Sequence, residues 1–203
     1  MHPATVRVDL GFTAVELPAG THICQVYTDD SERESSLNEY LLRGLQTHER
    51  CACFSDKTSA IEVGGYLDAR GVASGDALAT GALLVSGARE VYFAGDRFDP
   101  GRMLALLQGF YEASKAQGFR AARVIGEMDA AVNQVAGGSR LMEYESQVNS
   151  LVRNCPLSAV CQYDARAFDG ATIMDVLSVH PMMLIRGAVV HNPFFVPPEV
   201  LLG

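Results

Sequence analysis

The sequence has 203 residues, 48% of them hydrophobic, which suffices for one sizeable buried core but leaves little length for two. Its formal net charge is -8 and its 16 lysines and arginines are scattered, which excludes a protein that binds a nucleic-acid backbone directly. The sequence has neither the long apolar run of a membrane-spanning helix nor the pattern of a signal peptide at its start. We therefore expect a cytoplasmic protein without membrane association, whose cysteines are mainly buried free thiols.

The first predicted element is a buried strand at 22–27, HICQVY, followed by a short loop and an amphipathic helix. Ser31 and Glu34 have the spacing of a capping box, and Leu37 and Leu41 recur at helical spacing. A strand, a loop and a helix in this order form the frame of a phosphate-binding loop. The loop, however, has no GxxxxGK[ST] motif and carries acidic residues, which suit the helix dipole but repel phosphate. We therefore predict no binding of ATP.

The remaining predicted elements alternate between strands and helices. Apolar runs predict strands at 51–55, at 82–95 with an edge extension around Gly87, and at 121–128, 158–164 and 183–190. Helical spacing and capping residues predict helices at 58–70, 99–118, 139–153 and 171–178. Apolar strands separated by helices indicate a parallel sheet with both faces covered. The predicted fold class is therefore α/β, a three-layer domain with a mostly parallel central sheet.

Six segments, taken together, point to a known family. They are HICQVY at 22–27, FDPGRM at 98–103, GEMD at 126–129, LMEYESQVN at 141–149, CQYDARAF at 161–168, and VHP with HNPFF near the end. In this order and spacing they resemble the MEDS family, the methanogen/methylotroph DcmR sensory domain. The resemblance implies a RecA/KaiC-like fold that has lost its phosphate loop, and a role in sensing small molecules such as hydrocarbon derivatives.

The resemblance also implies how such a domain is used. Members of the family often carry a DNA-binding or kinase module. We therefore expect a non-catalytic sensory domain in transcriptional or signalling regulation, with a small organic ligand and a regulatory protein partner, a transcription factor or a kinase. We expect one domain over 1–203, with 1–20 as a peripheral N-terminal segment, and no cofactor. A homo-oligomer is compatible with this prediction.

A ligand site is expected at the carboxyl ends of the strands, where ligands of open α/β sheets bind. The predicted strands end in polar and aromatic residues, as a mostly apolar pocket with a few polar anchors requires. Glu143 is included because it or Glu145 is expected to face the pocket from its helix. The predicted ligand-binding residues are Tyr27, Glu127, Met128, Tyr163, His180 and Glu143.

Glu127 also supports other interpretations. It stands where a P-loop enzyme carries its magnesium-binding acid, so a degenerate nucleotide hydrolase is the main alternative function. The structural alternative is a carboxylate that caps a helix or pairs with Arg123. A third class of function is a pure protein-interaction scaffold. A sensor differs from such a scaffold in having an enclosed cavity for its ligand.

Metal and thiol sites depend on which strands are neighbours. Cys24, Cys161 and His22 could form a metal or thiol-switch site if their strands lie side by side. His22 and His180 are more simply interpreted as satisfied core histidines. Since the sequence has no CxxC, HxxxH or GxSxG motif, we expect no metal site and no catalytic residue.

Overall fold

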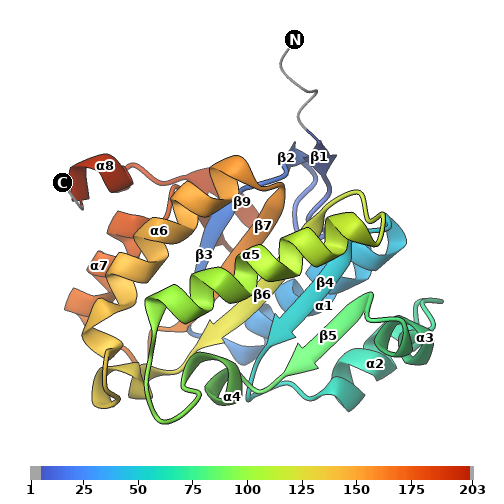
Figure 1. The fold of residues 1–203 in the computed structure, drawn as a ribbon, viewed down its shortest axis with the longest axis horizontal. Coiled ribbons are helices and arrows are strands. Elements are labelled where there is room, and N and C mark those ends of the chain that lie inside the picture. The colour runs from blue at the N-terminus through green and yellow to red at the C-terminus, as the bar shows by residue number, and fades with distance from the viewer. Residues whose placement is uncertain (1–5, 202–203) are drawn as a thin grey trace.

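The central sheet has the mostly parallel arrangement that the sequence predicts. In the computed structural model, which describes residues 6–201, seven strands of that range form one sheet in the order β5-β4-β6-β7-β3-β8-β9 (Figure 1). Strands β3 to β8 are parallel to their neighbours, and β9 is antiparallel at one edge. The strands are β3 (His22–Tyr27), β4 (Arg50–Phe54), β5 (Leu83–Ser86), β6 (Ala122–Met128), β7 (Leu157–Asp164), β8 (Met182–Ile185) and β9 (Ala188–His191).

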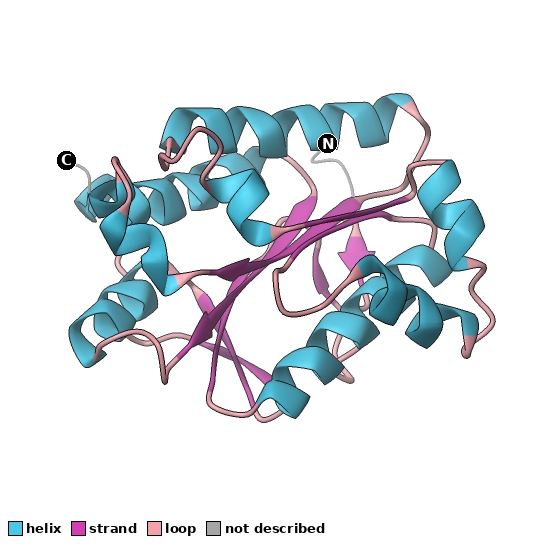
Figure 2. Cartoon of the chain, turned by 90° about the horizontal axis from the view of Figure 1, so that it is seen from below, coloured by secondary structure: helices cyan, strands magenta, loops and turns pink. Residues whose placement is uncertain are grey.

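Helices cover both faces of the sheet and complete the predicted three layers (Figure 2). Helices α1 and α2 pack on one face, and α4, α5, α6 and α7 pack on the other. None of the helices in residues 6–201 combines the length and hydrophobicity that crossing a membrane requires. The helices are α1 (Asp30–Gln46), α2 (Ala60–Asp68), α3 (Ser74–Ala79), α4 (Ala88–Tyr92), α5 (Pro100–Ala116), α6 (Leu141–Asn154), α7 (Gly170–Val179) and α8 (Pro198–Leu201), with short 3-10 turns η1 (Ala130–Gln134) and η2 (Gly138–Arg140).

Each face of the sheet has its own hydrophobic core, because side chains alternate between the faces along every strand. In β3, Ile23 packs with Leu37 of α1, whereas Cys24 packs on the opposite face, in the core beneath α5 and α6. The same alternation sends His22 and Tyr27, which belong to one strand, into two separate polar clusters.

Helix α1 begins before the predicted capping box. Its N-cap is Asp29, whose Oδ1 accepts a hydrogen bond of 2.8 Å from the backbone N–H of Ser31. The prediction that Ser31 and Glu34 form the cap is therefore wrong. Aspartate with extended backbone is among the best N-caps, so the helix starts two residues earlier than the capping box predicts.

The predicted strand at 82–95 is shorter than expected, because its second half is helix α4. Asp56 stabilises the start of that helix by accepting a hydrogen bond of 2.9 Å from the N–H of Arg89. Helical spacing then buries Ala88 and Tyr92 on the same side. A short apolar run does not distinguish strand from helix, and the tertiary contact decides between them.

The predicted final strand at 183–190 is a hairpin of β8 and β9. The two strands are joined by Arg186 and Gly187, whose φ angles are 49° and 76°. Positive φ at both central residues is typical of the type I′ turn that favours two-residue hairpins.

Residues 6–20 contribute to the core, although the sequence suggested a peripheral segment. Strands β1 (Arg7–Val8) and β2 (Leu17–Pro18) pair with each other, and Val8 and Leu10 are at most 1% exposed in the core beneath α1. Residues 1–5 of that segment lie outside the described range.

Candidate functional site

The carboxyl ends of β3, β6 and β7 meet around the ammonium group of Lys57, which follows β4. Its Nζ donates hydrogen bonds of 2.8 Å to the Tyr27 hydroxyl and to Asp164 Oδ2, and it lies 3.1 Å from Glu127 Oε1. Burial of Lys57 acts to lower its pKa. The hydrogen bonds to Asp164, Tyr27 and Glu127 outweigh this effect and raise the pKa of Lys57 above its usual value. Lys57 is therefore a fixed cation that joins three strand ends.

Glu127, near the end of β6, is engaged by several donors at this edge. It accepts hydrogen bonds from the Tyr27 hydroxyl and, at 3.0 Å, from the Ser55 hydroxyl. Arg123 pairs instead with Glu49 at 2.7 Å, with both side chains fully buried, so the pairing of Arg123 with Glu127 that the sequence suggested is wrong. Glu127 belongs to the Lys57 network.

Asp164, the last residue of β7, is held by a second cation. Arg166 donates two parallel hydrogen bonds to its carboxylate, of 2.8 and 2.7 Å, and also binds Asp30 at the start of α1. The hydrogen bonds from Arg166 and Lys57 hold the pKa of Asp164 well below its usual range. Glu127 and Asp164 are thus paired with Lys57 and Arg166 at the carboxyl ends of the strands.

A cavity of about 200 Å³ opens beside this network. It lies where the chain runs outward from β4 to β5 and then returns to β6, which is the position that ligands take in open α/β sheets. Its lining consists of Asp56, Lys57, Ala88, Glu127, Met128, Asp129, Ala130, Asp164 and Ala167. We call this the strand-edge cavity.

The loop after β3 contains its own anions. The carboxylate of Asp29 accepts a hydrogen bond from the backbone N–H of Ser31 in the first turn of α1, where a phosphate group would bind in a phosphate loop. Its neighbour Asp30 pairs with Arg166 at 2.8 Å and lies 4.0 Å from Lys57. The N-terminus of α1, which is the positive end of the helix dipole, therefore already has carboxylates as its counter-charges.

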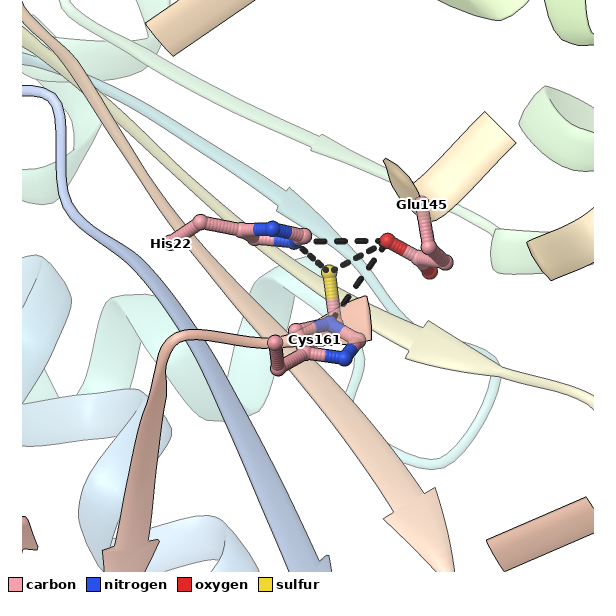
Figure 3. A group of neighbouring side chains, drawn as sticks. His22, Glu145 and Cys161 are labelled. Atoms are coloured by element: carbon pink, nitrogen blue, oxygen red, sulfur yellow. Dashed lines mark hydrogen bonds and ion pairs between the residues drawn. The ribbon is translucent and has the colours of Figure 1, made fainter. Parts of the chain in front are cut away.

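A second polar cluster lies beneath α6, on the other face of the sheet (Figure 3). The side chains of His22, Glu145 and Cys161 point toward one another from β3, α6 and β7, and His180, which follows α7, completes the group. Nitrogen, oxygen and sulfur atoms of these four residues all lie within 4.8 Å of one another. We call this group the buried cluster. Its residue types are those that bind transition metals.

The buried cluster is shielded from water. The side chains of His22 and His180 are 0% exposed and that of Glu145 is 1% exposed. Burial lowers the pKa of His180 to about 3, so its ring is neutral, and burial raises the pKa of the Cys161 thiol. Tyr163 donates a hydrogen bond of 2.5 Å to Glu145 Oε1. The site therefore has fixed geometry and low solvation.

The six predicted ligand-binding residues do not converge on one pocket. Glu127 and Met128 line the strand-edge cavity, and Tyr27 contacts Glu127 within the same network. These three lie where the switch-point rule places them. Their role in ligand binding stays a prediction.

Tyr163, His180 and Glu143 lie elsewhere. Tyr163 points beneath α6, because it alternates with Asp164, and His180 precedes β8, so both belong to the buried cluster or contact it. Glu143 is 34% exposed and pairs with Arg140 near the start of α6. Glu145, the alternative considered on the same helix, is the buried acid.

Lys57 was missed from the sequence, and Glu145 was considered only as the alternative to Glu143. Lys57 has no sequence signal, since its role arises from three strands that are distant in the chain. Glu145 does have one: it stands four residues after Leu141 and three before Val148, in the middle of the buried stripe of α6. A carboxylate at an apolar-face position indicates a buried polar site.

Solved structures share this fold. The flagellar accessory protein FlaH from Methanocaldococcus jannaschii has a TM-score of 0.64 and 13% sequence identity, covering 91% of this chain and 84% of that chain. A KaiC-like protein from Pyrococcus horikoshii OT3 has a TM-score of 0.60 and 11% identity, with coverage of 88% and 79%. An uncharacterized protein from Pyrococcus horikoshii, solved with an unknown peptide, has a TM-score of 0.60 and 12% identity, with coverage of 85% and 82%.

At these identities the comparisons establish the RecA/KaiC-like fold and carry no information on activity. No curated protein matches the sequence. The family described as MEDS, the MEthanogen/methylotroph, DcmR Sensory domain, matches residues 21–181. With that match over most of its length, the chain belongs to the MEDS family of sensory domains.

Proposed function

We propose that this chain is a non-catalytic sensory domain that binds a small, neutral, largely apolar molecule in the strand-edge cavity and signals its presence to a regulatory protein. The observation that carries this proposal is the cavity itself, which lies at the strand switch point beside a fixed polar network. A mostly apolar hollow with a few oriented polar groups is typical of a small-molecule site.

The charges around the cavity favour a ligand without negative charge. Among the described residues, its charged lining consists of Lys57 and the carboxylates of Asp56, Glu127, Asp129 and Asp164. Arg89 and Arg166 pair with Asp129 and Asp164. An anionic ligand would therefore meet an excess of carboxylates, while a neutral molecule could accept or donate a single hydrogen bond without displacing an ion pair.

The volume favours a small ligand. Pockets for drug-sized ligands usually enclose about 300–1,000 Å³, and this cavity encloses about 200 Å³. A molecule of a few carbon atoms fits this space, and Met128 with three alanines supplies the apolar surface. The small size agrees with the family's expected role in sensing simple organic compounds.

We infer that the domain is non-catalytic because the polar groups that a nucleotide hydrolase would use are already engaged in hydrogen bonds. Glu127 accepts hydrogen bonds from Tyr27 and Ser55 and contacts Lys57, so it is not free to position magnesium or water. Asp29 caps α1 where a phosphate would bind. Both features argue against the alternative of a nucleotide hydrolase.

Helix α4 and turn η1 are the elements through which occupancy could reach a partner. Ala88 of α4 and Ala130 of η1 line the cavity, and Arg89 joins the two elements by a 2.6 Å ion pair with Asp129. A ligand that contacts both alanines would alter the relative stability of these surface elements. A transcription factor or kinase that binds there would sense the change.

The test is a thermal-shift screen of the purified chain against small alcohols, halogenated alkanes, ketones and Mg-ATP. We expect stabilisation by at least one neutral organic compound and none by Mg-ATP. Ala167→Leu fills the cavity from an exposed position, and Ala171→Leu is the matched exposed control outside its lining.

Loss of the stabilisation in Ala167→Leu, with retention in Ala171→Leu, would support the site. Equal stabilisation of both variants would place the ligand elsewhere. Micromolar binding of Mg-ATP that is lost in Glu127→Gln would favour the nucleotide hydrolase instead.

A further inference from the structure

We propose that the buried cluster of His22, Glu145, Cys161 and His180 is a four-coordinate site for a divalent transition metal, with zinc as the best match. This inference does not depend on the ligand proposed for the strand-edge cavity, which lies at the carboxyl ends of the strands. It rests on three observations: the direction of the imidazole lone pairs, the distances between the donor atoms, and an unpartnered buried nitrogen.

The hydrogen bonds of His22 determine which of its nitrogens is free. Its Nδ1 lies 3.0 Å from Asn149 Oδ1. The amide nitrogen of Asn149 donates to the carbonyl oxygens of Glu145 and Val179, which fixes the amide so that Oδ1 can only accept. Nδ1 of His22 therefore carries the proton, and in the neutral ring Nε2 presents a lone pair to the cluster.

His180 has the same arrangement. Its Nδ1 lies 2.8 Å from the carbonyl oxygen of Val176, which can only accept, so Nδ1 carries the proton. Its Nε2 points to Glu145 Oε2 at 3.6 Å and has no hydrogen-bond partner among the described residues, although the side chain is 0% exposed. A buried nitrogen lone pair that faces a carboxylate oxygen is unfavourable unless a cation lies between them.

The distances between donor atoms match the edges of a metal tetrahedron. Zinc bonds of about 2.0–2.1 Å to nitrogen and oxygen and about 2.3 Å to sulfur give tetrahedron edges of about 3.3–3.6 Å. From Glu145 Oε2 the distances are 3.3 Å to His22 Nε2, 3.6 Å to His180 Nε2 and 3.6 Å to Cys161 Sγ. His22 Nε2 lies 3.4 Å from Cys161 Sγ. These four of the six donor–donor distances match the edges of a zinc tetrahedron, and the other two, from His180 Nε2 to His22 Nε2 and to Cys161 Sγ, are no longer than 4.8 Å.

The surrounding hydrogen bonds are those that orient metal ligands. Histidines that bind metals usually donate their other N–H to a carbonyl or carboxylate, as His22 and His180 do here to Asn149 and Val176. Glu145 uses Oε1 to accept from Tyr163, which leaves Oε2 for the metal. These contacts already hold the ligands in place.

Charge and ligand type favour zinc over harder ions. A divalent cation with the Glu145 carboxylate and a Cys161 thiolate is neutral overall, which suits a buried position. Two imidazoles, a thiolate and one carboxylate oxygen suit zinc, whereas calcium and magnesium prefer oxygen donors alone. Four protein ligands fill a tetrahedral site, so the metal would have a structural role and would connect β3, α6, β7 and the end of α7.

A cavity lies next to the site, at the amino ends of the strands. This cavity of about 410 Å³ is lined by His22 and Asn149 together with mainly apolar residues. It lies at the opposite edge of the sheet from the strand-edge cavity, because His22 begins β3 and Tyr27 ends it. A metal ion could reach the cluster from this side without disturbing the Lys57 network.

The test uses the full chain, purified without chelators and analysed for metals, then stripped and titrated with Zn²⁺ or Co²⁺. We expect one zinc ion per chain, and with Co²⁺ the strong visible bands of a tetrahedral site together with a near-ultraviolet thiolate-to-cobalt band. Zn²⁺ should also raise the Tm of the stripped chain. A stripped chain that folds but takes up neither ion, or a cobalt spectrum without the thiolate band, would overturn the proposal.

Two cysteine variants assign the sulfur ligand. Cys24 is the matched control, since it is buried on the same face and pairs with Cys161 across β3 and β7 but is not in the cluster. We expect Cys161→Ser to lose the thiolate-to-cobalt band and to bind Zn²⁺ about 100-fold more weakly or worse, and Cys24→Ser to retain both. Retention of the band in Cys161→Ser would refute the site, and the wild-type spectrum decides the question if that variant does not fold.

Discussion

The Lys57 network and the buried cluster lie on opposite faces of one sheet and differ in how their charges are balanced. The Lys57 network consists of Lys57, Tyr27, Glu127, Asp164 and Arg166. At the strand edge, Lys57 and Arg166 contact Glu127 and Asp164 and supply the cations that these carboxylates need. In the buried cluster, Glu145 faces two imidazole nitrogens and a thiol, and no arginine or lysine of the described residues pairs with it.

The two regions differ in whether the fold itself supplies the counter-charges of its buried polar groups. A network that contains its own cations is complete, and the space beside it is available for a neutral ligand. A cluster of donors with lone pairs aimed at one point, shielded from water, is incomplete without an added cation. The two regions therefore predict different responses to mutation, to metal and to pH.

The largest expected effect separates Glu145 from Glu143. Glu145→Ala should lower the free energy of unfolding by about 3 kcal/mol, because it leaves a cavity and removes the acceptor of the Tyr163 hydroxyl. Glu143→Ala, two residues earlier, removes a largely solvent-accessible pair with Arg140 and a long hydrogen bond from Gln147, and should cost at most about 0.5 kcal/mol. Urea denaturation measures both. Similar losses of unfolding free energy in the two variants would contradict the expectation that the buried Glu145 contributes more to stability than the partly exposed Glu143.

Asn149→Ala tests the orientation of His22 without removing a metal ligand. Loss of the acceptor for His22 Nδ1 should weaken Zn²⁺ binding by about 10- to 100-fold. Competition with a chromophoric chelator gives the affinity. Asn154→Ala, exposed near the end of the same helix, is the control and should leave the affinity unchanged. Equal affinities in both variants would show that Asn149 does not position the ring.

Lys57→Met should have a smaller effect, at the strand edge. It removes the cation shared by Glu127, Asp164 and Tyr27, but the side chain is 42% exposed and Arg166 still pairs with Asp164. We expect a loss of about 1 kcal/mol in unfolding free energy and no change in Zn²⁺ content. Loss of zinc in this variant would show that the two regions are coupled.

The smallest expected effect is a pH dependence from Asp164. Its folded-state pKa is below the usual 3.8, so its contribution to stability is complete above that pH and is lost as pH falls through and below it. The stability difference between wild type and Asp164→Asn should therefore shrink as the pH is lowered from about 5 to about 3. Denaturation at several pH values measures it, and a constant difference would mean that Asp164 has no shifted pKa.

The sequence predicts the sheet well, because continuous apolar runs such as those of β6 and β7 are typical of strands that are buried on both faces. It also locates Glu127 and Met128 at the correct edge, since position at a strand end follows from the order of elements. Helix α4 was missed because a short run such as 82–95 fits either strand or helix, and tertiary contacts decide. The hairpin turn was missed because Arg186-Gly187 lacks the Asn-Gly or Asp-Gly signal of a two-residue turn.

The side chains of the clusters were harder to predict, for physical reasons. Alternation along β7 sends Tyr163 to one face and Asp164 to the other, so neighbouring residues serve different sites. The sequence showed Cys161 and His22 as candidates for a metal site, but their meeting with His180 and Glu145 depends on how α6 and α7 pack. Regular metal-binding spacing is absent because each donor comes from a different element.

The buried cluster requires an added cation, whereas the Lys57 network already contains the cations it needs. Anomalous X-ray diffraction at the zinc edge, from crystals of the chain purified without chelators and supplied with Zn²⁺, tests both halves at once. We expect one strong peak between the Nε2 atoms of His22 and His180, Glu145 Oε2 and Cys161 Sγ, and none beside Glu127. No peak at the buried cluster, or a peak among the strand-edge carboxylates, would contradict it.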